Sequence, residues 1–253
     1  MKKEMNIAIL LAAGSGRRMG SDKKKQFMEL GGVPVLCHSL KALDESFMDH
    51  IVLVTGREDE DYCRREILEK SGIKTPVTIT EGGRERYHSV YNGICEASRL
   101  GADHVFIHDG ARPFVDEQIL ERCLSSVREH GACAAAVPVK DTIKRGSRDG
   151  FAVETLKRDE LWSMQTPQVF DTLLIQKCYE KLIGSETDLK EKGIPITDDA
   201  FAVELFSDTP VFLTMGSYDN IKLTTPEDLI LGERILEQRR NAADNPPGAH
   251  TEK

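Results

Sequence analysis

The fold of this 253-residue chain is decided by the segment at residues 7–20, which reads IAILLAAGSGRRMG. An apolar run of strand length ends at Ala12 and Ala13 and opens into glycines and arginines, and lysines follow at residues 23–25. A buried strand that ends in a basic, glycine-rich loop presents backbone N–H groups and positive charge to a phosphate. We therefore interpret the segment as a binding loop for a nucleoside triphosphate, with Ala12, Ala13, Gly14 and Gly16 as nucleotide-binding residues. The alternative is a surface turn with a solvated basic run.

Two better-known glycine loops do not fit this segment. The dinucleotide pattern G-x-G-x-x-G requires a third glycine where Met19 stands, which argues against a dehydrogenase. The P-loop pattern ends in Gly-Lys-Ser/Thr, whereas Gly20 is followed by serine and aspartate. A different nucleotide-binding loop therefore remains.

The remaining pattern is Ala-Ala-Gly-x-Gly-x-Arg-Met-Gly, with a lysine five residues later. Gly14 and Gly16 allow the backbone to approach a phosphate closely, because they carry no Cβ atom. Arg18 and Lys25 add fixed positive charge. The neighbouring Lys24 is an alternative to Lys25.

The composition favours one main domain, which we expect at residues 1–240. A chain with 40% hydrophobic residues can bury a full core. The net charge of −8 argues against a nucleic-acid or membrane-surface partner, so the basic cluster at residues 17–25 is a local exception. Such a local exception indicates a site.

The cysteines and the N-terminus favour a cytoplasmic protein. The six cysteines are scattered and include no C-x-x-C pair, which is typical of reduced thiols in the cytosol. The first apolar run ends in a charged loop rather than a cleavage site, and no segment approaches the length of a membrane span.

Apolar stretches and helical stretches alternate along the chain. Further strands are expected at residues 51–55, 77–80, 104–108, 134–139 and 211–215. Helices are expected at residues 34–43, 58–70, 116–130, 171–183 and 226–238. A further helix is expected to follow the loop at residues 81–90 and to end at Ser98. The alternation predicts an α/β fold with a mostly parallel, twisted sheet and helices on both faces. We interpret Thr166-Pro167 as a turn, residues 190–193 as a polar loop and residues 241–253 as a disordered tail.

A candidate metal ligand, Asp109, follows the strand at residues 104–108. Ligands of open α/β sheets bind outside the carboxyl ends of the strands, so this carboxylate should face the glycine loop. Mg²⁺ is commonly held by one or two carboxylates and the substrate's phosphates. We predict Asp109 as a Mg²⁺ ligand. The alternative is an Asp-Gly turn in which Arg112 pairs with the carboxylate, and His108 is expected to be structural.

Residues 140–160 form a different pattern, with two alternating runs separated by a Gly/Ser/Asp turn. The pattern predicts a long hairpin with too few apolar residues to stand alone. We expect a protruding arm that crosses a second copy of the chain and forms a homodimer. The alternative is an arm folded back on its own subunit.

Five separated motifs, in order along nearly the whole chain, resemble the cytidylyltransferases that activate small polyol phosphates, and most closely the 2-C-methyl-D-erythritol 4-phosphate cytidylyltransferases. The resemblance implies a single-domain, Rossmann-like nucleotidyltransferase fold. In the motif GGxxRxxSV at residues 82–90 it assigns Gly83 and Ser89 to cytosine and ribose recognition. The alternative is a strand-to-helix turn with Ser89 in the first helical turn.

The other motifs imply further site residues. The motif DNxKxTxPED at residues 219–228 makes Lys222 catalytic, and Asp219 is a possible second metal contact. The arm is implied to send Thr142 and Arg158 into the neighbour's site. The acceptor-side residues are Arg112, Thr166 and Thr197, of which Thr197 also starts a stretch that predicts a helix N-cap.

The implied reaction is attack by the phosphate oxygen of methylerythritol phosphate on the α-phosphorus of CTP, with release of pyrophosphate. The nucleophile is already an anion, so catalysis depends on positioning and charge neutralisation. Arg18, Lys25, Lys222 and Mg²⁺ on Asp109 would supply the charge. Two alternatives are a ribitol-5-phosphate cytidylyltransferase and a non-catalytic, dimeric nucleotide-sensing module.

Overall fold

A seven-stranded sheet forms the centre of the molecule in the computed structural model, which describes residues 3–14 and 24–244. The strand order is β11-β7-β10-β6-β1-β4-β5. β10 is antiparallel to both of its neighbours, and the other neighbouring pairs are parallel. The expected mostly parallel α/β fold is therefore confirmed. The strands are β1 (Asn6–Leu11), β4 (His50–Thr55), β5 (Val77–Glu81), β6 (His104–Asp109), β7 (Ala132–Pro138), β10 (Trp162–Asp171) and β11 (Phe212–Met215).

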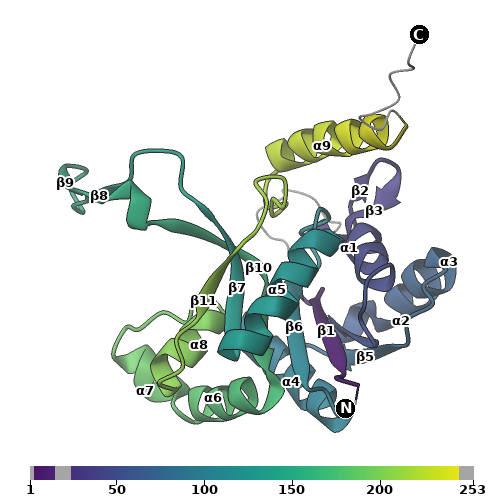
Figure 1. Ribbon diagram of the computed structural model, residues 1–253, viewed down its shortest axis with the longest axis horizontal. Coiled ribbons are helices and arrows are strands. Elements are labelled where there is room, and N and C mark those ends of the chain that lie inside the picture. The colour runs from purple at the N-terminus through teal and green to yellow at the C-terminus, as the bar shows by residue number, and fades with distance from the viewer. Residues whose placement is uncertain (1–2, 15–23, 245–253) are drawn as a thin grey trace.

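Strand β1 lies between β4 and β6, and its alternating side chains serve two separate cores. Ala8 and Leu10 belong to one apolar cluster with side chains of α1 (Val35–Asp44) and α5 (Glu117–His130). Ile7 and Ile9 belong to another, with side chains of α4 (Arg86–Arg99), α6 (Thr172–Gly184) and α8 (Asp199–Phe206). Because successive side chains of a strand point to opposite faces, a continuous apolar run is what a sheet covered on both faces requires. Figure 1 shows the sheet between these helices.

The helices follow the expected ranges with a few differences. They are α1 (Val35–Asp44), α4 (Arg86–Arg99), α5 (Glu117–His130), α6 (Thr172–Gly184), α7 (Glu186–Glu191), α8 (Asp199–Phe206) and α9 (Pro226–Asp244). The expected helix at residues 58–70 is a composite that contains a π-helical stretch at Cys63–Leu68 between α2 (Glu60–Tyr62) and α3 (Glu69–Ser71). The interpretation of residues 190–193 as a loop is partly wrong, because α7 includes Lys190 and Glu191.

The stretch around Thr166 was interpreted as a turn, and this is wrong. Thr166 and Pro167 lie inside β10, joined by a cis peptide bond, where the pairing with β7 is irregular between Met164 and Gln168. Proline has no N–H and is tolerated in a sheet at such an irregularity. The strand thus delivers Thr166 to the centre of the sheet.

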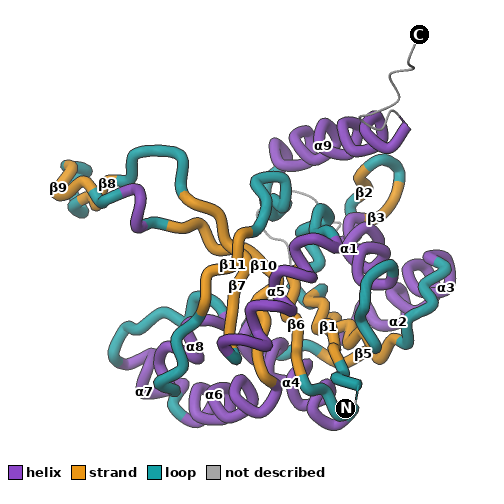
Figure 2. Tube along the Cα trace, viewed as in Figure 1, coloured by secondary structure: helices purple, strands orange, loops and turns teal. Residues whose placement is uncertain are grey.

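Residues 140–160 form an arm that extends away from the sheet (Figure 1). Its hairpin pairs β8 (Lys144–Gly146) with β9 (Ala152–Thr155), and residues 141–155 are exposed throughout. Figure 2 shows the loops that connect this hairpin with β7 and β10. The alternative of an arm folded back on its own subunit is therefore wrong.

Helix α9 and the small hairpin of β2 (Glu29–Leu30) and β3 (Val33–Pro34) extend the molecule on another side. Leu30, Val35, Phe114, Leu223 and Ile235 form a third apolar cluster there. The expected tail begins too early, since α9 continues to Asp244, and residues 245–253 lie outside the described residues. No helix in the described part of the chain is long and apolar enough to span a membrane.

Candidate active site

A cavity of about 420 Å³, here called the glycine-loop cavity, lies at the carboxyl ends of β1, β5 and β6. This position follows the rule for ligand sites in open α/β sheets. Lys25 and Lys222, from opposite ends of the chain, both line it. Its walls also include Ala13, Gly14, Gly83, Arg86, Ser89 and Asp109.

The described ends of the basic loop are held in place by Gln26. Its side-chain amide donates hydrogen bonds to the carbonyl oxygens of Ala12 (2.5 Å) and Gly14 (3.0 Å). Ala12 itself is buried and does not belong to the cavity wall. Gly16 and Arg18 lie outside the described residues, so their expected roles stay predictions.

Lys24 and Lys25 point to different places. The Lys24 ammonium group lies 2.5 Å from a carboxylate oxygen of Glu58 and 2.6 Å from one of Asp59. Lys25 lines the glycine-loop cavity, and Lys24 is absent from its wall. Of the two alternatives, the geometry therefore favours Lys25.

Gly83 and Ser89 shape the opposite wall. The Ser89 hydroxyl accepts a hydrogen bond from the backbone N–H of Gly83 (3.0 Å) and donates to the carbonyl of Glu85 (3.3 Å). A Cβ atom on Gly83 would lie 2.2 Å from Cβ of His88, which leaves no room for a side chain. Ser89 therefore lines the cavity and also fixes the backbone of the loop, so both readings of it fit.

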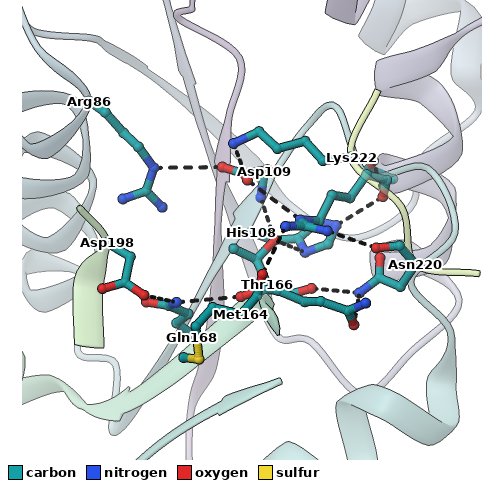
Figure 3. A network of polar contacts seen from close by, with 12 residues as sticks. Arg86, His108, Asp109, Met164, Thr166, Gln168, Asp198, Asn220 and Lys222 are labelled. Atoms are coloured by element: carbon teal, nitrogen blue, oxygen red, sulfur yellow. Dashed lines mark hydrogen bonds and ion pairs between the residues drawn. The ribbon is translucent and has the colours of Figure 1, made fainter. Parts of the chain in front are cut away.

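Asp109 is surrounded by three cations. Its Oδ2 lies 2.8 Å from Nζ of Lys222 and 3.6 Å from Nε of Arg112, and its Oδ1 lies 3.7 Å from Nε of Arg86. Burial alone would raise the pKa of this carboxyl, but the charges of Arg86, Lys222 and Arg112 hold the pKa well below its usual range. Asp109 is therefore an anion that gathers positive charge at the end of β6 (Figure 3).

His108 is structural, as expected. Its Nε2 lies 3.1 Å from the carbonyl oxygen of Arg112, and its Nδ1 lies 3.0 Å from Oγ1 of Thr166. A carbonyl only accepts, so Nε2 carries the proton and Nδ1 accepts from the Thr166 hydroxyl. Complete burial lowers the pKa of His108 to about 4, which keeps the ring neutral. It is unsuited to act as a general base.

Thr166 also accepts a hydrogen bond from the backbone N–H of Asp109 (3.1 Å). Its hydroxyl therefore donates its one proton to His108 and accepts a hydrogen bond from Asp109. Thr166 does line a second cavity of about 350 Å³, here called the α8 cavity. Its expected contact with an acceptor phosphate stays a prediction.

The α8 cavity adjoins the glycine-loop cavity, because Arg86, Asp109 and Lys222 line both. Thr197 lines the α8 cavity, and its expected place near the acceptor stays a prediction. The N-cap of α8 is Asp198, whose carboxylate accepts from the N–H of Phe201 (3.1 Å), and not Thr197. Thr197 precedes the cap, and so its side chain is available to the cavity.

Gln168 fixes the N-terminus of α8 beside that cavity. Its Oε1 accepts from the backbone N–H groups of Asp199 and Ala200, each at 2.9 Å, and its Nε2 donates to Asp198 (2.9 Å). Figure 3 shows Gln168 beside Asp198, with the hydrogen bond between them as a dashed line. Sequence reasoning missed this residue because its glutamine amide lies far from α8 in the sequence.

Arg112 holds the loop that carries Lys222. Its guanidinium donates to the carbonyl oxygens of Asn220 (2.8 Å) and Met164 (3.4 Å), and the N–H of Leu223 donates to the carbonyl of Ala111 (2.9 Å). Arg112 lines the α8 cavity, and its expected pairing with Asp109 is present at 3.6 Å. Both interpretations of Arg112 therefore fit.

Besides Ala12, three expected site residues of the described part of the chain do not line these two cavities. Asp219 is exposed and belongs to neither wall, which gives no support for a second metal contact. Thr142 and Arg158 lie on the exposed arm, and Arg158 donates to the carbonyl of Lys140 (3.2 Å). Both would have to act on another copy of the chain.

Arg86 is a cavity residue that the sequence reasoning missed. It is the arginine of the motif GGxxRxxSV, whose glycine and serine were assigned while the arginine was not. The motif itself names this arginine, so Arg86 could have been included among the expected site residues.

The comparisons with known proteins point to one family. The family model described as IspD, 2-C-methyl-D-erythritol 4-phosphate cytidylyltransferase, matches residues 6–238. A protein of that name from Clostridium botulinum (strain Eklund 17B / Type B) is 44% identical over 92% of this chain and 99% of its own. One from Lachnospira eligens is 45% identical over 89% of this chain and 96% of its own.

Solved structures show the same relationship. The crystal structure of 4-diphosphocytidyl-2C-methyl-D-erythritol synthase from Anaerococcus prevotii superposes with a TM-score of 0.80 and 34% identity, covering 92% of this chain and 96% of that one. The Francisella tularensis cytidylyltransferase gives a TM-score of 0.73 and 27% identity, covering 91% and 99%. The expected resemblance is confirmed. The chain therefore belongs to the 2-C-methyl-D-erythritol 4-phosphate cytidylyltransferase family of nucleotidyltransferase enzymes.

Proposed function

We propose that this chain transfers CMP from CTP to 2-C-methyl-D-erythritol 4-phosphate and releases pyrophosphate, as a step of isoprenoid precursor synthesis. CTP would occupy the glycine-loop cavity and the polyol phosphate the α8 cavity. The observation that carries the proposal is that the two cavities share Asp109 and Lys222, while Lys25 lines the first. Phosphates bound in the two cavities would therefore come together beside Asp109 and Lys222.

The proposed mechanism rests on charge and position. The acceptor phosphate attacks the α-phosphorus as an anion, so the chief barrier is repulsion between two negative groups. Lys222 is held toward the junction by Asp109, and Lys25 lines the glycine-loop cavity. Arg18 lies outside the described residues, and we expect it to add a further cation. Preorganised cations of this kind typically contribute on the order of 2–4 kcal/mol of transition-state stabilisation each. Neutral His108 has no step to perform.

We extend the proposal to Mg²⁺ on Asp109. The described residues contain no cluster of three or more metal-ligating side chains. Mg²⁺ in phosphoryl-transfer sites nevertheless needs only one or two carboxylates in addition to substrate phosphates. Asp109 is ionised and lines both cavities, so the donor set fits. When bound there, the ion would supply charge neutralisation to the substrate phosphates.

We also propose that the chain works as a cytoplasmic homodimer joined by the arm. Ile143, Phe151 and Val153 expose apolar surface on the arm, with 74% of Phe151 accessible. An exposed hairpin of this composition needs a surface to lie on. A partner would bury these side chains, and its site would receive Thr142 and Arg158.

The test is pyrophosphate release measured with each of the four nucleoside triphosphates and two acceptors, methylerythritol 4-phosphate and ribitol 5-phosphate. The proposal predicts turnover with CTP and methylerythritol phosphate. Preferred turnover of ribitol 5-phosphate would favour the ribitol enzyme. Binding of CTP without pyrophosphate release from any pair would favour the sensing module.

A further inference from the structure

Arg86 occupies the wall between the glycine-loop cavity and the α8 cavity. It opens helix α4, and its side chain lines both cavities. One third of this side chain is exposed, although it is ion-paired to a fully buried carboxylate. A cation that is both fixed and open to a cavity is suited to bind an anion.

Asp199 fixes the orientation of Arg86. The two terminal nitrogens of the guanidinium donate to the two carboxylate oxygens of Asp199, each at 2.7 Å. Tyr179 donates to the same carboxylate at 2.5 Å, and Asp199 has no exposed surface. A bidentate pair of this kind fixes the plane of the guanidinium as well as its position.

The Nε side of the guanidinium faces the junction. Nε lies 3.7 Å from Oδ1 of Asp109, and Lys222 approaches the other oxygen of that carboxylate (Figure 3). Arginine carries five N–H donors, so the bonds to Asp199 leave donors over for a ligand. Arg86 and Lys222 thus flank Asp109 at the wall that the two cavities share.

Resting on the proposed transfer of CMP at these two cavities, we propose that Arg86 is a further catalytic residue, which binds a phosphate oxygen at this junction, and that Asp199 is its positioning residue. The competing explanation is that Arg86 only neutralises the buried charge of Asp199. The two explanations differ in what happens when both charges are removed together, because a buried pair can be replaced at little cost to stability when neither partner is left alone.

The experiment compares Arg86→Gln, Asp199→Asn and the double variant Arg86→Gln/Asp199→Asn. The melting temperature and steady-state pyrophosphate release with CTP and methylerythritol phosphate are measured for each. Arg86→Gln alone should lower the melting temperature, because the buried Asp199 carboxylate loses its ion-pair partner. It should also lower kcat, because the cation at the junction is removed. The double variant should recover the melting temperature of the wild type while its kcat stays lower by about 100-fold or more. A double variant that is stable and turns over within about threefold of wild type would overturn the proposal.

Arg86→Lys decides the question if the double variant fails to fold, as judged by circular dichroism. Lysine keeps a positive charge beside Asp199. Its single ammonium group cannot bind both carboxylate oxygens as the guanidinium does and also direct a donor to the junction. It should fold and lose about tenfold or more in kcat. An unchanged kcat would overturn the proposal.

A matched control lies at the other end of the same helix. Arg99 pairs with Glu96 (2.6 Å), is 68% exposed and lines neither cavity. Arg99→Gln/Glu96→Gln removes another ion pair between an arginine and a carboxylate, and both of its residues lie in α4. It should leave kcat within about twofold of wild type, because exposed pairs contribute little.

Discussion

Nζ of Lys222 lies 2.8 Å from Oδ2 of Asp109, so a residue from the last loop of the fold is tied to the end of central strand β6. Arg112 reinforces this connection by binding the carbonyl of Asn220. The lysine is thereby held at the wall between the two cavities before any substrate arrives. Preorganisation of this kind makes a cation effective against developing negative charge.

Lys222→Met should therefore fold normally and lose about 100-fold to 1000-fold in kcat. Asp109 keeps Arg86 and Arg112 as partners, which limits the loss of stability. Initial rates of pyrophosphate release and a thermal melt measure the two effects. Lys192→Met removes an exposed lysine paired with Asp188 and serves as the control. Near-normal turnover of Lys222→Met would remove Lys222 from the mechanism.

The two neighbouring lysines of the basic loop should respond differently to substitution. Lys25→Ala should lower kcat by about 100-fold, because it removes a cation from the glycine-loop cavity. Lys24→Ala should stay within about threefold of wild type, because Lys24 pairs with Glu58 and Asp59 instead. The same pyrophosphate assay compares the two variants. The reverse order of effects would assign the loop's phosphate contact to Lys24.

The free energy of unfolding should decrease as the pH is lowered, because of His108. Its pKa is about 4 in the folded protein, below the ordinary value of 6.5, because the ring is buried. Between these two values the unfolded chain binds a proton that the folded chain does not, so the free energy of unfolding decreases as the pH falls from 6.5 to about 4. The loss should reach about 3 kcal/mol.

Urea unfolding of the protein without nucleotide or divalent metal, at several pH values, measures this loss. His108→Gln is the comparison, because its amide can donate to the Arg112 carbonyl and accept from Thr166 but does not titrate. Its stability should change less between pH 6.5 and pH 4. Identical slopes for the two proteins would show that His108 is not responsible.

The arm should act between subunits. Phe151→Asp places a charge on its most exposed apolar side chain and should convert a dimer into a monomer in sedimentation velocity. Leu173→Asp, on α6, changes an equally exposed residue outside the arm and should leave the dimer intact. If the Phe151→Asp variant is still a dimer, the interface lies elsewhere, whatever the result for Leu173→Asp.

Mixed subunits test whether Arg158 acts in the neighbouring site. Lys25→Ala and Arg158→Ala should each be nearly inactive alone. After the two are unfolded and refolded together, half of the dimers are mixed, and each contains one site with both residues intact. Activity should return to about a quarter of wild type. No return of activity would mean that both residues serve the same chain's site.

The sequence predicts the parallel strands well, because strands buried on both faces are continuous apolar runs such as β1 and β4. It fails at β10, where the polar residues Gln165, Thr166 and Gln168 lie in the sheet because their side chains bind a loop, the neighbouring strand β6 and helix α8. No local pattern distinguishes such a strand from a turn that contains proline.

The same division applies to the site. Asp109 and Lys25 follow from position, since each lies beside the end of a predicted strand or within a glycine loop. The choice between Lys24 and Lys25 depends on Glu58 and Asp59, and the orientation of Arg86 depends on Asp199; these partners are distant in sequence. Such pairings become visible only when the chain is folded.

A crystal structure with the product, 4-diphosphocytidyl-2-C-methyl-D-erythritol, and Mg²⁺ tests the central claim most directly. We predict that its diphosphate lies at the wall shared by the two cavities, within hydrogen-bonding distance of Lys222 and close to Asp109, with the cytidine toward Gly83 and the polyol toward Thr197. A diphosphate bound away from Lys25 and Lys222 would contradict the account.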